Sequence, residues 1–78
     1  MQYVYLIESV GSPDRRFVGI TSDLRRRLRD HNTGKASHTS KFAPWQLVTY
    51  LAFSDPLKAQ DFELYLKSGS GHAFARKR

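Results

Sequence analysis

The sequence of 78 residues contains no cysteine, so no disulfide bond can stabilise the fold. This absence suits a reducing compartment, and we expect the protein to be cytoplasmic. The sequence also contains no long apolar run, so we expect neither a membrane-spanning helix nor a secretory leader. A chain of this length corresponds to a single domain, residues 1–78, with a thin hydrophobic core.

Acidic residues are scarce relative to basic ones. Thirteen lysines and arginines face seven aspartates and glutamates, which gives a formal net charge of +6. Most of the basic residues are arginine, whose guanidinium binds phosphate oxygens through two N–H groups at once. A small arginine-rich domain of this charge is typical of proteins that bind nucleic acid. The alternative is a basic surface without such a partner, because charge alone does not specify function.

Several familiar kinds of site are missing. The sequence has no cysteine–histidine set with the spacing of a metal centre, and no glycine-rich loop between a strand and a helix that would hold a phosphate. It also has no serine, histidine and aspartate at a spacing that supports nucleophilic catalysis. Any catalytic site must therefore be built from the basic, aromatic and acidic side chains that remain.

Apolar periodicity and turn residues predict three strands and two helices. The strands are expected at 1–9, 16–20 and 45–53, and the helices at 23–31 and 56–67, with a possible short helical turn at 72–77. The first two strands form a hairpin, because turn-forming residues lie between them. The third strand is apolar at most positions, and we expect it to be the central one. This order predicts an α/β (α+β) fold in which a three-stranded sheet is covered by helices.

The first predicted helix carries charged groups on the face that should be buried. Leu24, Arg27, Leu28 and His31 follow the spacing i, i+3, i+4 and i+7, which places them on one face. A guanidinium and an imidazole just beyond the end of a strand are suited to a phosphate-binding site. Each also has a structural interpretation. Arg27 can cover the core with its head group in water, and His31 can interact with the helix dipole.

The second predicted helix has a glutamate on its apolar face. Ala59, Phe62, Glu63 and Leu66 share one face of this helix. Because glutamate is rarely buried without a partner, one interpretation is that Glu63 forms an ion pair with a nearby arginine or lies at the rim of the apolar face. The other is that it acts as a metal ligand or acid–base group. A single carboxylate suits Mg²⁺, which takes its other ligands from water and substrate phosphate.

Four residues would form a minimal set for metal-assisted hydrolysis of a phosphodiester bond: Tyr5, Arg27, His31 and Glu63. The arginine would stabilise charge on the phosphoryl group, and the tyrosine or histidine would orient water or move a proton. The tyrosine can equally be a packing residue of the first strand. Basic and hydroxyl side chains elsewhere would contact the nucleic-acid backbone: Arg16, Arg26, Lys35, His38, Ser40, Lys41, Lys67 and Arg76. The loop around 38–41 and the tail 67–78 can also be ordinary solvated segments.

Short motifs follow one another in order along nearly the whole chain. They are Tyr3-Val4-Tyr5, Phe17-Val18-Gly19-Ile20-Thr21, Asp23-Leu24 with Arg27-Leu28 and His31-Asn32, Thr39-Ser40-Lys41, Pro44-Trp45, Phe62-Glu63 and Tyr65-Leu66-Lys67-Ser68-Gly69. As an ordered set they resemble the GIY-YIG nuclease family, in particular its small single-domain bacterial branch. The resemblance implies a three-stranded antiparallel sheet and cleavage of DNA with one divalent metal ion, Mg²⁺ or Mn²⁺.

The resemblance also implies roles for individual residues. Tyr5 is similar to the tyrosine of the first motif, and Gly19 to the glycine of the second, where the backbone packs closely. Arg27 matches the arginine that engages the scissile phosphate. His31 matches a histidine found in many members, and Glu63 matches the metal-binding glutamate.

Phe17 departs from the family pattern, because the second motif normally has a tyrosine at this place. The loss of one acid–base group typically costs about 10²–10⁴ in rate rather than all activity, and Tyr5 or His31 can take over. We therefore expect a metal-dependent DNA endonuclease. The alternatives are a non-catalytic nucleic-acid-binding module derived from a nuclease, or a protein-interaction domain. A domain this small is expected to recognise DNA structure, as in DNA repair, or to depend on a protein partner.

Overall fold

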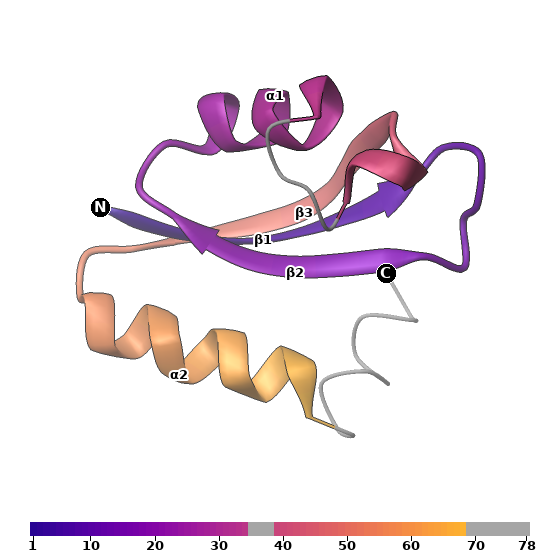
Figure 1. Cartoon of the computed structure of the whole chain (residues 1–78). Coiled ribbons are helices and arrows are strands. Elements are labelled where there is room, and N and C mark those ends of the chain that lie inside the picture. The colour runs from indigo at the N-terminus through magenta and orange to yellow at the C-terminus, as the bar shows by residue number, and fades with distance from the viewer. Residues whose placement is uncertain (35–38, 69–78) are drawn as a thin grey trace.

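The structure, a computed structural model, describes residues 1–34 and 39–68, which form a sheet between two helices (Figure 1). The strands β1 (Gln2–Ser9), β2 (Arg16–Thr21) and β3 (Trp45–Phe53) form an antiparallel sheet in the order β2-β1-β3. Helix α1 (Leu24–Thr33) covers one face of this sheet and helix α2 (Pro56–Lys67) covers the other. The α+β fold expected from the sequence is confirmed. The helical turn expected at 72–77 lies outside the described residues.

The central strand is β1, so the prediction that β3 would be central was wrong. Four consecutive side chains of β1, from Val4 to Ile7, are at most 2% exposed. The edge strand β3, in contrast, leaves Leu47, Tyr50 and Leu51 exposed. Because helices cover both faces of the sheet, an edge strand also carries apolar residues on both faces. Its composition therefore does not distinguish it from a central strand.

The alternation of side chains along β1 divides the core into two clusters. Val4 packs with Ala59 and Leu66 of α2. Tyr5 and its neighbours on the other face pack with Trp45, and the leucines of α1 cover them. Because successive side chains of a strand point to opposite faces, Tyr5 lies on the face that α1 covers.

Both helices begin at the residues that the sequence indicates. The carboxylates of Asp23 and Asp55 accept hydrogen bonds from backbone N–H groups of the first turns of α1 and α2. Helix α1 ends with Gly34, whose φ of +88° is in the left-handed region that favours glycine. The sequence did not predict the short 3-10 helix at Ser40–Phe42. Within the described ranges, no helix is both long and apolar enough to cross a membrane.

Candidate active site

A buried chain of hydrogen bonds connects β1, α1 and the segment that precedes β3. The hydroxyl of Tyr5 lies 2.8 Å from Nε2 of His31, and Nδ1 of His31 lies 2.6 Å from the hydroxyl oxygen of Thr39. These residues are only 2%, 3% and 4% exposed, respectively. A neutral imidazole donates from one nitrogen and accepts at the other, so both hydrogen bonds can form at once. Because both ring nitrogens are engaged, His31 can act on a substrate only through a neighbour.

Of the three residues linked by these hydrogen bonds, Thr39 is the one that the sequence did not single out. Sequence reasoning placed it in a loop suited to phosphate contact, but its side chain is buried against His31. Its carbonyl oxygen accepts a hydrogen bond of 2.8 Å from the indole N–H of Trp45, a residue of the core. No periodic pattern relates a loop hydroxyl to a histidine eight positions earlier. The only available sequence signal was the presence of Thr39 in one of the family motifs.

Burial and nearby charges determine the protonation states at the site. Burial lowers the pKa of His31 below 6.5, the positive charge of Arg27 lowers it further, and Asp30 opposes the shift. Burial raises the pKa of Tyr5 to about 12, with Arg27 opposing and Glu63 adding to the shift. At neutral pH the imidazole is therefore uncharged and the tyrosine hydroxyl is protonated. The helix-dipole interpretation of His31 is not supported, since a helix C-terminus favours the charged form.

We expect the stability of the protein to decrease as the pH falls below about 6.5. Because the pKa of His31 is lower in the folded protein, the unfolded chain binds more protons between the two pKa values, and stability rises with pH there. Thermal unfolding monitored by circular dichroism between about pH 7.5 and about pH 5.5 would show a falling midpoint. The His31→Asn variant should show a smaller decrease than the parent. An equal decrease in His31→Asn would contradict this assignment.

Gly19 of β2 allows the side chain of Tyr5 to cross the strand. The two residues are directly opposite each other in the β1–β2 register. A Cβ atom at position 19 would lie 2.4 Å from the hydroxyl oxygen of Tyr5 and 2.5 Å from its Cζ. The close packing expected at the glycine of the second motif is therefore present, and the group that packs there is the Tyr5 phenol.

The Gly19→Ala substitution should destabilise the protein by about 1–3 kcal/mol, because the overpacked Tyr5 ring is buried and held by His31. The thermal midpoint would measure this loss. Gly11→Ala is a matched control, since nothing lies within 4 Å of a Cβ at that position. In a Tyr5→Leu background the cost of Gly19→Ala should largely disappear. Equal stabilities of the two alanine variants would contradict the proposed contact.

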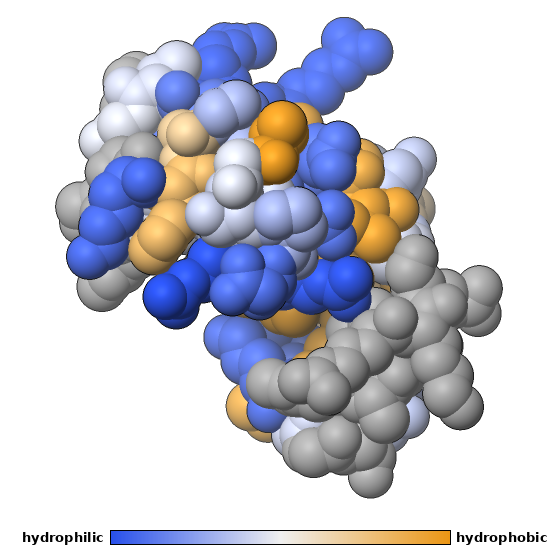
Figure 2. Space-filling model, turned by 90° about the vertical axis from the view of Figure 1, so that its right-hand side faces the viewer, coloured by the Kyte–Doolittle hydropathy of each residue, from blue (hydrophilic) through white to orange (hydrophobic). Residues whose placement is uncertain are grey.

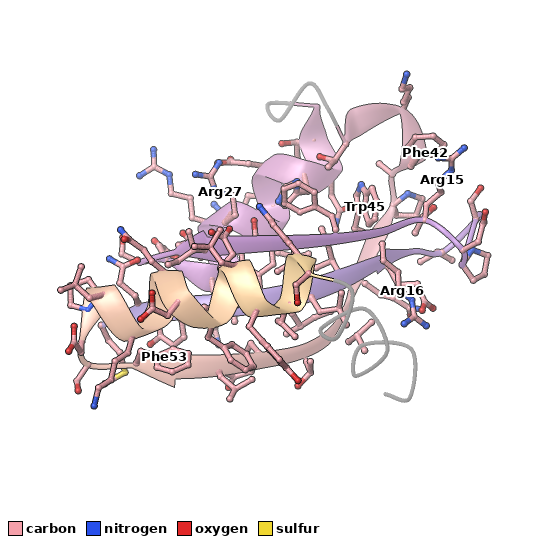
Figure 3. The ribbon with its side chains drawn as sticks, turned by 90° about the horizontal axis from the view of Figure 1, so that it is seen from below. Arg15, Arg16, Arg27, Phe42, Trp45 and Phe53 are labelled. Carbon is pink, nitrogen blue, oxygen red and sulfur yellow. The ribbon has the colours of Figure 1, made fainter. Side chains whose placement is uncertain are left out.

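Arg27 and Glu63 belong to different helices, and the charge of each influences Tyr5. Arg27 is an exposed residue of α1, and in Figure 3 it lies at the edge of the sheet opposite to Phe53 of β3. Glu63 belongs to α2, which packs against β1 and β2. Both charges act on the tyrosine hydroxyl, one lowering and one raising its pKa. Arg27 and Glu63 are thus both within electrostatic range of Tyr5, and His31 is hydrogen-bonded to its hydroxyl.

Glu63 lies at the rim of the core. Its side chain is 17% exposed, and a carboxylate oxygen lies 3.4 Å from Nζ of Lys67, one helical turn later. The expected ion pair is therefore present, with a lysine instead of an arginine. Among the described residues, no group of three or more acidic, histidine or cysteine side chains is arranged to hold a metal ion. A single, partly exposed carboxylate fits one Mg²⁺ ion that takes its remaining ligands from water and phosphate.

Phe17 supplies the ring of the second motif without its hydroxyl. It packs edge-on against the imidazole of His31, with ring centroids 5.1 Å apart and an interplanar angle of 61°. Its centroid lies 6.3 Å from that of Tyr5. The substitution therefore leaves an aromatic ring beside the two groups, and the hydroxyl of Tyr5 is the phenolic group bonded to the histidine.

The predicted backbone-binding residues have different environments. Arg26 lines an open pocket of about 250 Å³ together with Arg27. Arg16 forms an ion pair of 3.3 Å with Glu8, and Lys67 is paired as described above. The side chains of Lys35, His38 and Arg76 lie outside the described residues, and of Ser40 only the backbone is described. Of the described members of this set, Arg26 and Lys67 thus adjoin candidate catalytic residues, Arg27 and Glu63 respectively.

Lys41 lies at a different end of the molecule, beside the β1–β2 turn. Its Nζ is 5.9 Å from the centroid of the Phe42 ring, and the guanidinium carbon of Arg15 is 4.9 Å from the same centroid. Figure 2 faces this end, where hydrophilic and hydrophobic side chains are intermixed. The sequence did not single out Arg15. Both cations can interact with the aromatic ring as well as with an external anion.

Comparison with known proteins adds a second line of argument. Residues 1–77 match the GIY-YIG catalytic domain. A structure-specific endonuclease subunit SLX1 homolog of Giardia intestinalis is 38% identical over 65 residues, which cover 78% of this chain and 18% of that protein. The chain likewise spans only 23% of the SLX1 subunit of Candida dubliniensis. It therefore corresponds to about a fifth of the length of these relatives.

Two shorter relatives match over most of their length. The UPF0213 protein SAG0778 of Streptococcus agalactiae is 35% identical over 72 residues, which cover 91% of this chain and 80% of that protein. The UPF0213 protein HQ_3675A of Haloquadratum walsbyi is 37% identical over 67 residues, which cover 85% and 73%. The match over residues 1–77 and the similarity to these relatives show that this chain belongs to the GIY-YIG catalytic domain family.

Proposed function

We propose that this protein is a metal-dependent endonuclease that hydrolyses phosphodiester bonds in DNA, with one Mg²⁺ or Mn²⁺ ion bound by Glu63. The observation that carries the proposal is that Tyr5 is hydrogen-bonded to His31 and lies within electrostatic range of Arg27 on α1 and Glu63 on α2. A cation, a carboxylate and a proton-transfer pair are the groups that phosphodiester hydrolysis requires. The net charge of +6 favours a polyanionic substrate.

Arg27 and Glu63 would act on the phosphate. The guanidinium would bind the scissile phosphate and stabilise the negative charge that develops on it. The carboxylate would hold the metal ion, which supplies Lewis-acid stabilisation of the phosphate oxygens when bound. Lys67 would then exchange its contact with the carboxylate for one with the DNA backbone, since its side chain is 52% exposed and free to rotate.

Tyr5 would accept the proton of the attacking water. Its own hydroxyl proton would pass to Nε2 of His31 over the 2.8 Å hydrogen bond, while the leaving oxygen takes a proton from solvent. Because the pKa of His31 is lowered, its imidazole is uncharged at neutral pH, and Nε2 has a lone pair to which this proton can be transferred. His31 is thus a positioning and proton-accepting residue that acts through Tyr5, because its own ring nitrogens are buried and engaged.

The substrate is proposed to be DNA with a branch or an unpaired segment. The SLX1 relatives are named as structure-specific endonuclease subunits, which supports this choice and a protein partner that contributes to specificity. We extend both features to this chain as proposals, because it spans only about a fifth of those proteins. A role in DNA repair is proposed on the same basis.

The proposal is tested by incubating the purified protein with labelled linear, nicked, flap and branched DNA in Mg²⁺, in Mn²⁺ and in EDTA. We expect cleavage that requires metal and is strongest on branched DNA. If roughly six to ten phosphates are contacted, binding should weaken about 10³–10⁵-fold between about 50 and 200 mM salt. Cleavage that persists in EDTA, or a weak dependence of binding on salt, would contradict the proposal.

The second candidate function is a non-catalytic nucleic-acid-binding module. The specific observation in its favour is Phe17, which lacks the hydroxyl of the second motif. This alternative predicts salt-sensitive binding to branched DNA without cleavage in either metal. The same experiment therefore separates the two functions.

A further inference from the structure

A second open pocket, with an aromatic wall, lies beside the candidate active site. It has a volume of about 370 Å³ and is lined by Tyr3, Ser22, Asp23, Leu24, Arg25 and Tyr50. The rings of Tyr3 and Tyr50 meet edge to face, with centroids 6.1 Å apart and an interplanar angle of 62°. This volume falls within the range of pockets that bind small organic groups.

The position of Tyr50 explains why its ring reaches this pocket. It is paired with Tyr5 across the β1–β3 register, so both side chains point to the face of the sheet that α1 covers. Yet Tyr50 is 50% exposed, whereas Tyr5 is only 2% exposed. Packing within the protein therefore uses only part of the Tyr50 ring, and the rest of the ring is available to a ligand.

The aromatic pocket adjoins the pocket that contains Arg27. Ser22 and Asp23, at the start of α1, line both. A DNA strand whose scissile phosphate is bound by Arg27 would therefore place a neighbouring nucleotide at the aromatic pocket. This adjacency connects the pocket to the same strand that the active site would cleave.

The chemistry of the lining suits a nucleobase. Two tyrosine rings and Leu24 favour a flat, uncharged ring system. Arg25, on the same wall, can bind the backbone phosphate attached to such a base. Bases inside a duplex are already stacked on their neighbours, so a base that enters the pocket must be unpaired and turned out of the helix.

We propose that Tyr3 and Tyr50 form a subsite that binds an unpaired nucleobase next to the phosphate held by Arg27. This inference rests on the proposed function and specifies its substrate class. The preferred DNA has a single-stranded nucleotide adjacent to the cleaved bond. Recognition of branched DNA would then reside partly in this domain, since fully paired DNA offers no free base to the tyrosines.

The test measures binding of fluorescein-labelled flap DNA by fluorescence anisotropy in EDTA, so that cleavage plays no part. Tyr50→Ala should weaken binding to the flap about tenfold, within the range of about 5–150-fold that one base–aromatic stack contributes. Tyr50→Phe should bind like the parent, because the aromatic face is retained. Leu51→Ala is a matched control at the next, similarly exposed position of β3.

The decisive comparison uses a flap whose single-stranded arm lacks bases but keeps its sugar-phosphate backbone. The parent and Tyr50→Ala should bind this DNA equally, because the stacking partner is missing from the DNA. The inference is overturned if Tyr50→Ala binds the normal flap as tightly as the parent. An equal loss on normal, base-free and fully paired DNA would overturn it too. If the parent shows no salt-sensitive binding to any of these DNAs, the proposed function itself fails. If the parent shows salt-sensitive binding but binds the normal and the base-free flap equally, only the subsite is contradicted.

Discussion

Replacement of Glu63 by glutamine should reduce metal-dependent DNA cleavage by about 10³-fold or more. The amide keeps the size of the side chain but removes the charge that would hold the metal ion, and the ion contributes several kcal/mol of transition-state stabilisation. Folding should be almost unaffected, because the ion pair with the exposed Lys67 is of a kind worth only about 0.3–0.5 kcal/mol. Single-turnover cleavage of branched DNA at saturating Mg²⁺ measures the effect.

Asp61→Asn provides the matched control for this substitution. Asp61 is an exposed carboxylate on the same helix, two residues before Glu63, so its variant removes an equal charge without touching the candidate site. We expect its cleavage rate to stay close to that of the parent. A second readout is Mg²⁺ binding by calorimetry in the presence of uncleavable DNA, which should be lost only in Glu63→Gln. Comparable rates in the two variants would show that Glu63 does not hold the metal.

Tyr5→Phe should lower the cleavage rate by about 10²–10⁴-fold, the usual contribution of a positioned acid–base group. The ring stays in the core cluster, so the change removes only the hydroxyl that is bonded to His31. The unpaired imidazole nitrogen should cost about 1–3 kcal/mol of stability, which thermal unfolding would report. DNA binding should be retained, and this separates a chemical defect from a binding defect.

Tyr65→Phe controls for the loss of a tyrosine hydroxyl, since Tyr65 is exposed on α2. Its rate should match that of the parent. Phe17→Tyr, which restores the usual residue of the second motif, should change the rate much less than Tyr5→Phe if Tyr5 performs the proton transfer. A large gain in Phe17→Tyr, together with an undiminished rate in Tyr5→Phe, would assign the proton transfer to position 17 instead.

Local signals in the sequence were sufficient to predict the three strands, the two α-helices and the helical face on which Glu63 lies. Asp23 and Asp55 mark the starts of the two helices, because their carboxylates accept hydrogen bonds from backbone N–H groups two or three positions later. Gly34 marks the end of α1, because its backbone is in the left-handed region. The spacing of apolar residues in α2 likewise predicted that Glu63 lies on the apolar face of the helix, and in the structure its side chain is half-buried. Such features depend on backbone geometry within one element, so a single sequence is enough to predict them.

The tertiary structure decided how these elements combine. Strand order depends on hydrogen bonds between strands that are far apart in the sequence. The composition of each strand therefore did not reveal that β1 rather than β3 is central. The packing of the Tyr5 phenol over Gly19 follows from the register of two strands, and the contact of Thr39 with His31 follows from the path of a loop. The sequence by itself thus determined which groups are available for catalysis. Long-range packing determined that His31 is hydrogen-bonded to Tyr5 and Thr39, because only the assembled sheet and helices place these side chains within hydrogen-bonding distance.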